Sequence, residues 1–250
     1  MKRILTSLFT AIFFFTLSIP VFASENNVSQ SEYDQFKNDF LEATLEGNHN
    51  LAESFVDNAS PELLAHYANT ADVFDSEKVN EKLKDLKLGP NGSTVVIMDD
   101  GSFVEVTTTT RQVNDNNVPI ENNEFSTMDY KEDYDMSGTS WVTDYTYDYG
   151  GNGKLAVLKL NTYYTLGRNM KIYETDTSGT KGSAGIGVSS SASVTANNVP
   201  KARARGTYNI NIFGGGSETY TLYTEVGFLN AWQDPYGYFY VSYYTDSWRS

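Results

Sequence analysis

The sequence predicts an α+β protein in which a region of short helices precedes an antiparallel β-sandwich or barrel. The first observation is a shift in composition: both histidines lie before residue 90, whereas 16 of the 18 tyrosines, all three tryptophans and 15 of the 19 glycines follow residue 128. The second is a change in apolar spacing, from a helical repeat in the first part to alternation in the last. Two such regimes indicate two kinds of structure in one chain.

The first 23 residues have the pattern of a secretory signal peptide. Lys2 and Arg3 form a basic start, an apolar run follows, and Val21 and Ala23 put small residues at the positions that a signal peptidase reads. We therefore expect a secreted, extracellular protein that is cleaved after Ala23, the alternative being an uncleaved membrane anchor. No later stretch is apolar and long enough to span a bilayer, so no membrane partner is expected after cleavage.

Residues 24–90 predict several short amphipathic helices. Ser31 with Asp34 has the spacing of a capping pair, and apolar side chains follow at helical intervals. Ser60 before Pro61 marks another start, because serine caps the first amides and proline fits the first helical position. Helices this short are not stable alone, so they must pack on one another or on the rest of the chain.

Residues 91–112 predict a β-hairpin, because alternating apolar side chains flank an Asp-Gly pair at Asp100 that supplies the positive φ of a tight turn. Residues 113–137 lose this alternation and are rich in asparagine and acids, which predicts a solvated linker. Residues 138–250 hold seven short alternating segments separated by glycine-rich turns, as an antiparallel sandwich or barrel does. No helical repeat interrupts them, so a parallel α/β sheet is not expected.

The composition excludes several kinds of site and partner. The chain has no cysteine, so it has no disulfide, no thiolate metal site and no cysteine nucleophile. Two histidines are too few for a three-histidine zinc site. The formal net charge of −14 argues against nucleic acid as the main partner, because an acidic surface repels phosphates. The oligomeric state stays open.

No catalytic set can be assembled from motifs, so we name no catalytic residue. The chain has neither a G-x-S-x-G elbow nor an H-E-x-x-H sequence, and His49 and His66 lie far in sequence from any serine on a strand. Asp144 and Asp148 share one face of a predicted strand at a separation of about 13 Å. That exceeds the spacing in either class of glycosidase. A secreted carboxylate-dependent hydrolase would need a partner acid from another strand, and it remains an alternative.

A partial calcium pattern precedes the first predicted strand of the C-terminal region. Asp133, Asp135 and Ser137 put oxygen ligands at alternate positions before Gly138, and Asp144 stands at the twelfth position. Calcium loops use this alternation, with glycine permitting the sharp turn, although their twelfth ligand is usually Glu. Calcium is therefore the one cofactor that the sequence suggests, the alternative being the charged end of a linker.

Two aromatic stripes predict a ligand surface. Each lies on one face of a predicted strand: Trp141, Tyr145 and Tyr147 on the first, and Tyr236, Tyr238, Tyr240 and Tyr244 on the last. Both faces of the last strand are aromatic or apolar, so we expect one of them to be partly exposed. Exposed Tyr and Trp rings stack on sugars while nearby polar groups bind hydroxyls. The alternative is that tyrosine simply favours half-buried strand faces.

Lys201, Arg203 and Arg205 alternate, which places three cations on one side of an extended segment in an otherwise acidic chain. They predict an anion-binding stripe that would suit a phosphate-rich polymer. The alternative is a charged sheet edge that blocks association between strands.

The signal peptide, Gly151-Asn152-Gly153-Lys154-Leu155-Ala156-Val157-Leu158-Lys159 and Ala204-Arg205-Gly206-Thr207-Tyr208 together resemble small uncharacterised exported proteins of bacilli and other Gram-positive bacteria. The resemblance covers the C-terminal half and implies no catalytic residue. We expect a secreted, non-enzymatic protein that binds a cell-wall or extracellular polymer, a glycan, through a Tyr/Trp-rich sheet face. A β-domain with a removable N-terminal pro-segment is a further alternative.

Overall fold

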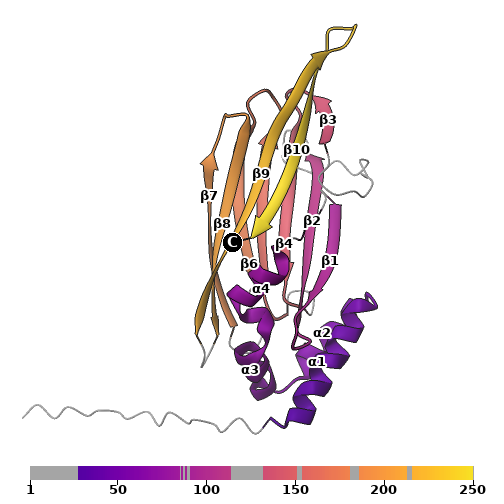
Figure 1. The fold of residues 1–250 in the computed structure, drawn as a ribbon, viewed down its shortest axis with the longest axis vertical. Helices are drawn as coiled ribbons and strands as arrows, with labels where there is room; N and C mark the ends of the chain where they lie inside the picture. The colour runs from indigo at the N-terminus through magenta and orange to yellow at the C-terminus, as the bar shows by residue number, and fades with distance from the viewer. Residues whose placement is uncertain are drawn as a thin grey trace, which may run out of the picture.

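The fold is α+β, as the sequence predicts, with helices at the N-terminal end and two five-stranded antiparallel sheets after them (Figure 1). The computed structural model describes residues 28–84, 86, 88, 91–113, 132–150, 154–180, 186–212 and 216–249. The predicted signal peptide and most of the predicted linker lie outside these ranges. The strands within them form no closed barrel, so that alternative is wrong.

Capping residues set the starts of the helices. Ser60 accepts a hydrogen bond from the backbone of Leu63 at 3.1 Å, as predicted. The first helix begins earlier than expected, because Ser29 rather than Ser31 accepts from the amide of Glu32, at 3.2 Å, in an S-x-x-E pattern. The helical elements are α1 (Gln30–Leu45), α2 (His49–Asn58), α3 (Pro61–Thr70), the 3-10 helix η1 (Asp72–Phe74) and α4 (Ser76–Leu83). In the part of the chain that the structure covers, no helix is both long and apolar enough to cross a membrane.

The first sheet contains the predicted hairpin, whose turn is closed by a bond from the amide of Gly101 to the carbonyl of Met98 at 3.0 Å. The hairpin does not stand apart, because its second strand pairs with the strand after the linker, from Glu105 opposite Asp148 to Val113 opposite Ser140. The order is β1 (Asn91–Ile97), β2 (Phe103–Val113), β4 (Ser140–Asp148), β5 (Val157–Thr165) and β6 (Lys171–Thr180).

The second sheet recruits five residues that the sequence assigns to the linker. The order is β3 (Glu132–Met136), β10 (Phe239–Arg249), β9 (Ser217–Gln233), β8 (Lys201–Ile212) and β7 (Ile186–Ala196). β3 is acidic, and it pairs only with β10 at the edge of the sheet, where charged residues are tolerated. The linker prediction is therefore wrong for these five residues.

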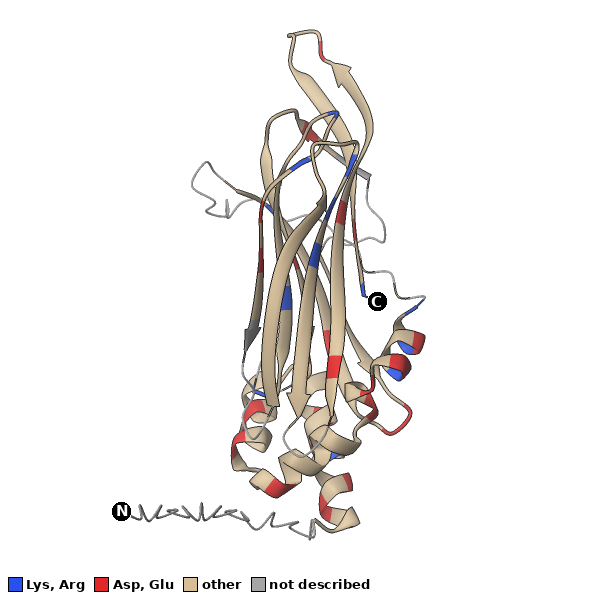
Figure 2. Cartoon of the chain, turned by 90° about the vertical axis from the view of Figure 1, so that its left-hand side faces the viewer, with Lys and Arg blue, Asp and Glu red and all other residues tan. Residues whose placement is uncertain are grey.

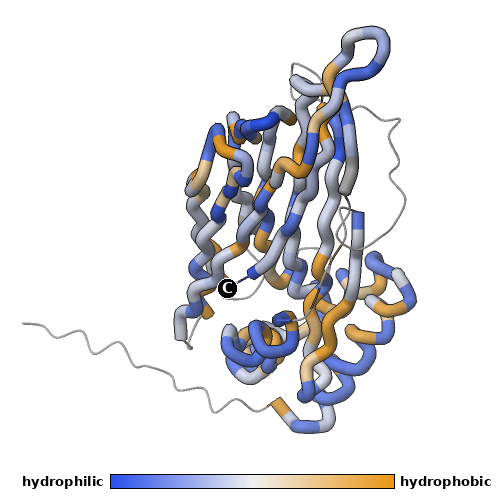
Figure 3. The backbone as a smooth tube through the Cα atoms, turned by 45° about the horizontal axis from the view of Figure 1, so that its top comes forward, coloured by the Kyte–Doolittle hydropathy of each residue, from blue (hydrophilic) through white to orange (hydrophobic). Residues whose placement is uncertain are grey.

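The buried side chains form two groups at opposite ends of the sheets. One group joins the helices to both sheets and contains Phe40, Tyr67, Leu158 and Tyr220 among others. The second group, around Trp141, holds strand and turn residues of both sheets and no helical residue. Acidic residues recur along the helices (Figure 2), and hydrophobic stretches alternate with hydrophilic ones along helices and strands (Figure 3). Because the first of these two groups contains helical residues and the second does not, the helices cover one end of the sheets (Figure 1).

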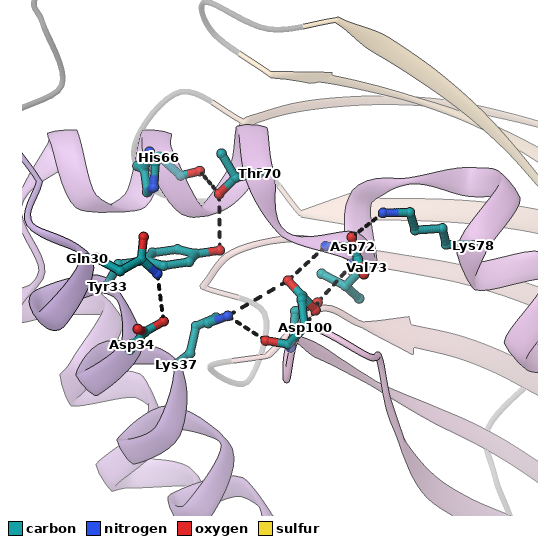
Figure 4. A network of polar contacts seen from close by, with 11 residues as sticks. Gln30, Tyr33, Asp34, Lys37, His66, Thr70, Asp72, Val73, Lys78 and Asp100 are labelled. Carbon is teal, nitrogen blue, oxygen red and sulfur yellow. Dashed lines mark hydrogen bonds and ion pairs between the residues drawn. The ribbon is translucent and has the colours of Figure 1, made fainter.

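Asp100, in the β1–β2 turn, ties the helices to the first sheet (Figure 4). Its carboxylate accepts from the backbone of Asp72 at 3.1 Å, and its carbonyl accepts from Lys37 of α1. Ser102 accepts in turn from the backbone of Val73 at 3.0 Å. Burial alone would raise the pKa of Asp100, but hydrogen bonds from Ser102 and Asp72 and the charge of Lys37 hold it below its ordinary value. The network therefore stabilises the charged turn.

Candidate functional site

A hairpin formed by β9 and β10 extends beyond the other strands at the end opposite the helices (Figure 1). Asp234 fixes its turn, because one carboxylate oxygen accepts from the amides of Tyr236 and Tyr238, each at 2.9 Å. Gly237 supplies a positive φ of 92°. The turn therefore holds Tyr236 and Tyr238 at the tip of the molecule.

Large apolar rings are exposed around this tip. Tyr236 is 87% exposed and Tyr134, on the neighbouring β3, is 64% exposed. We call the group the tip aromatic cluster: it consists of Tyr134, Trp232, Tyr236, Tyr238, Phe239 and Tyr240. Ring contacts join three members, Tyr134, Trp232 and Tyr240, and neighbouring exposed rings mark an interaction surface more often than scattered ones do.

Three strands contribute rings to a platform within the cluster. Trp232 stacks on Tyr240 with ring centroids 5.7 Å apart and an interplanar angle of 14°. The ring centroid of Tyr134, on β3, lies 5.5 Å from that of Trp232, and the two rings are tilted by 59° to each other. Asn230 and Ser242 pair across the strands two residues away, so they share the face of Trp232 and Tyr240. The platform therefore combines apolar rings with neighbouring amide and hydroxyl groups.

The other predicted aromatic stripe lies inside the molecule. Trp141, Tyr145 and Tyr147 are all nearly completely buried, with Trp141 only 2% exposed. They occupy the inward face of β4, a central strand of the first sheet, and Trp141 contacts Tyr243 of the second sheet at 6.1 Å. The prediction of an exposed face is therefore wrong for these three residues, because the second sheet covers them.

Of the stripe on the last strand, Tyr236, Tyr238 and Tyr240 belong to the tip, whereas Tyr244 does not. Tyr244 is buried on the outer face of β10, where its hydroxyl donates to Glu225 and its ring packs over Gly227. A Cβ atom at residue 227 would lie 1.9 Å from that ring, so the contact requires glycine. Tyr244 therefore has a packing role here.

The three cations of β8 share the outer face of the second sheet, and the central one, Arg203, is already paired with a carboxylate. The guanidinium of Arg203 donates from Nε to Glu225 at 3.2 Å and lies 5.1 Å from the Trp248 ring. Burial raises the pKa of Glu225, and the bonds from Tyr244 and Arg203 outweigh it, so the carboxyl stays charged. An anion at Lys201, Arg203 and Arg205 would compete with this carboxylate. β8 lies between β7 and β9, so the edge interpretation is wrong.

The predicted calcium ligands do not converge. Asp135 accepts from the indole of Trp141 at 3.2 Å, whereas Asp144 projects to the opposite face of β4 and pairs with Arg111 and Lys159. Ser137 is exposed, and the side chain of Asp133 lies outside the described part. Among the residues covered by the structure, no group of three or more His, Asp or Glu is placed to hold a metal ion.

Three of the other residues considered for catalysis, Asp144, Asp148 and His66, have local partners. Asp148 accepts from the amide of Gly150 at 2.8 Å, and the two cations beside Asp144 compensate its charge. His66 packs edge-on against Tyr33 at 4.7 Å, and His49 is exposed at the start of α2. No acid–base pair is therefore assembled among these four residues.

Sequence reasoning missed three members of the tip cluster. Tyr134 lies in the predicted linker, and Trp232 and Phe239 belong to neither of the predicted aromatic stripes. The position of Trp232 only four residues before Tyr236 was the signal that could have added it to the stripe on the last strand.

Comparisons of the chain with protein-family models, with curated proteins and with solved structures give no match.

Proposed function

We propose that the protein is a secreted, non-enzymatic binding protein that holds a cell-wall or extracellular glycan on its tip aromatic cluster. The observation that carries this proposal is the exposed stack of Trp232 on Tyr240, extended by Tyr134. Flat rings contact the apolar faces of sugars, and the neighbouring Asn230 and Ser242 would bind hydroxyls. The two sheets would pack face to face as a β-sandwich that carries the hairpin at its end.

The charges around the tip favour a neutral glycan over a phosphate-rich one. Residues 132–138 and 230–242 contain no lysine or arginine, whereas both segments contain aspartate. An anionic polymer or an anionic lipid surface would meet no cation in these segments and would be repelled by the net charge of the chain. Export by a Gram-positive bacterium would bring such a surface into contact with wall glycan.

The test is co-sedimentation of the mature protein with purified Gram-positive sacculi, with the supernatant assayed for released sugars. We expect the protein to pellet without release of sugars. The double variant Trp232→Ala/Tyr240→Ala should bind roughly 30-fold more weakly, because two stacking rings contribute about 1 kcal/mol each. Tyr173→Ala is the matched control, since that tyrosine is 38% exposed on β6 of the first sheet and is not a member of the tip aromatic cluster.

Other outcomes would point to a different binding surface or to a different function. Equal pelleting of the double variant and the parent would remove the tip cluster as the binding surface. Released sugars would direct attention to the carboxylates of the sheets and to the hydrolase alternative. The pro-segment alternative predicts a stable shorter species with a new N-terminus between residues 113 and 137. Its formation would strip β1 and β2 from β4 and uncover the core around Tyr147.

A further inference from the structure

The inward face of β10 ends on a buried guanidinium without a hydrogen-bond acceptor. Nε, Nη1 and Nη2 of Arg249 are all buried, and none of them has a hydrogen-bond partner. The group lies 4.1 Å from the centroid of the Tyr220 ring and 5.6 Å from that of Tyr147. The hydroxyl of Tyr149 is also buried nearby, and the charge of Arg249 lowers the pKa of that tyrosine against the larger, opposite effect of burial. The ring contacts offset part of the charge, but they bring no anionic acceptor to the N–H donors of the guanidinium.

An uncompensated guanidinium is unfavourable inside a protein. Buried charges are normally paired with an opposite charge, because removal from water is costly and only an acceptor of opposite charge restores the lost interactions. Arg203, on the outer face of the same sheet, shows the usual solution, since it pairs with Glu225. The contrast indicates that the described part of the chain supplies no anionic partner to Arg249.

A cavity of about 260 Å³ adjoins the guanidinium, between α4 and the ends of β4 and β10. It is lined by Asn80, Leu83, Lys84, Leu86, Tyr145, Tyr147, Trp248 and Arg249. Lys84 adds a second cation. The side-chain oxygen of Asn80 is buried and has no donor. The cavity wall therefore offers unused donors, an unused acceptor and positive charge.

Two tyrosine hydroxyls extend the polar part of the wall. Tyr145 and Tyr147 share a hydrogen bond of 2.8 Å. Burial raises the pKa of Tyr147 to about 12, so both hydroxyls are neutral at physiological pH and add no negative charge to the cavity. The leucines and Trp248 make the remaining wall apolar, which suits a ligand with a short hydrocarbon part.

We propose that this cavity binds a small α-hydroxy or α-amino carboxylate, with its carboxylate on Arg249 and its donor group on Asn80. A guanidinium presents paired N–H groups that match the two oxygens of a carboxylate. The volume is below the usual range for ligand pockets, so the occupant is small. The site is independent of the glycan surface, because Arg249 and Phe239 are separated by about 33 Å along β10.

The test is calorimetric titration of the full mature chain with lactate, alanine, acetate and inorganic phosphate, each up to about 10 mM. We expect lactate or alanine to bind at least tenfold more tightly than acetate, which has the carboxylate but no donor. Lactate binding with no alanine binding would assign the site to hydroxy acids, and the reverse to amino acids. Absence of binding by both, or tighter binding of phosphate than of either, would overturn the proposal.

Variants separate a ligand site from a structural arginine. Arg249→Leu should lose at least tenfold in affinity and, without ligand, keep a Tm equal to or above that of the parent, because an unpaired buried charge is removed. Arg205→Leu, on the outer face, is the control and should bind normally. Asn80→Asp places a carboxylate in the cavity, so it should raise the Tm and abolish binding. A lower Tm in both Arg249→Leu and Asn80→Asp, together with unchanged ligand binding by whichever variant still folds, would contradict the proposal.

Discussion

The helical end and the hairpin tip both gather aromatic rings, but they place them in opposite environments. At the helical end, Phe40 packs 4.9 Å from Phe103 and is completely buried. At the tip, Trp232 and Tyr240 stack at a similar distance and remain in contact with solvent. The difference is that helices cover the first group, whereas no element in the described ranges covers the second. Rings at the first end therefore stabilise the fold, and rings at the second are available to a ligand.

The largest expected effect is on the free energy of unfolding, which should differ between substitutions at the two ends. Phe40→Ala should lower the free energy of unfolding by about 3–5 kcal/mol, because it leaves a cavity among Phe36, Tyr67 and Phe103. Tyr236→Ala at the tip should change it by less than about 0.5 kcal/mol. Urea unfolding followed by circular dichroism measures both. Comparable losses in the two variants would show that the tip rings also serve the fold.

Two separate glycines allow the helical end and the hairpin end to be compared through backbone substitutions. Gly150 and Gly138 both have a positive φ, but a Cβ at Gly150 would lie 2.4 Å from Phe40, while nothing lies within 4 Å at Gly138. Gly150→Ala should therefore cost about 2–4 kcal/mol, since backbone strain and overlap add. Gly138→Ala should cost about 1–2 kcal/mol from strain alone. Thermal unfolding of the two variants should rank them in this order, and equal midpoints would refute the contact with Phe40.

A smaller effect is expected from the charged turn that anchors the helices. Asp100→Asn keeps a turn-forming Asx-Gly pair but should lower stability at pH 7 by about 1–2 kcal/mol, through weaker hydrogen bonds. The pKa of Asp100 is lower in the folded state than in the unfolded state. Its contribution is therefore complete above an unfolded pKa of about 4 and is lost as the pH falls through the folded pKa.

Unfolding measured from pH 7 down to pH 3 checks this prediction, because the difference between the parent and Asp100→Asn should shrink as the pH falls. Asp99→Asn is the control, since Asp99 is exposed and pairs with Lys82 at the surface. Its effect should be smaller and should disappear at high salt. A difference for Asp100→Asn that is independent of pH would contradict the assigned network.

The candidate sites were predictable only in part. The tyrosines at positions 236, 238 and 240 were found from alternation, because spacing along a strand is a local property. The burial of Trp141, Tyr145 and Tyr147 was not predicted. The sheet that packs against a strand decides which face of the strand is covered, and that sheet is not visible in the local sequence. Arg249 carried no signal either, since its lack of a partner follows from the positions of several distant segments.

The sequence by itself determined the local structure of this protein. Serine caps, the Asp-Gly turn and the two apolar periods specified helices, a hairpin and strands, because these depend on neighbours within a few residues. Only the tertiary structure decided the pairing of β2 with β4, the recruitment of β3 to the edge beside β10, and the separation of buried rings from exposed ones. Those outcomes arise from contacts between segments distant in sequence, and no local pattern encodes them.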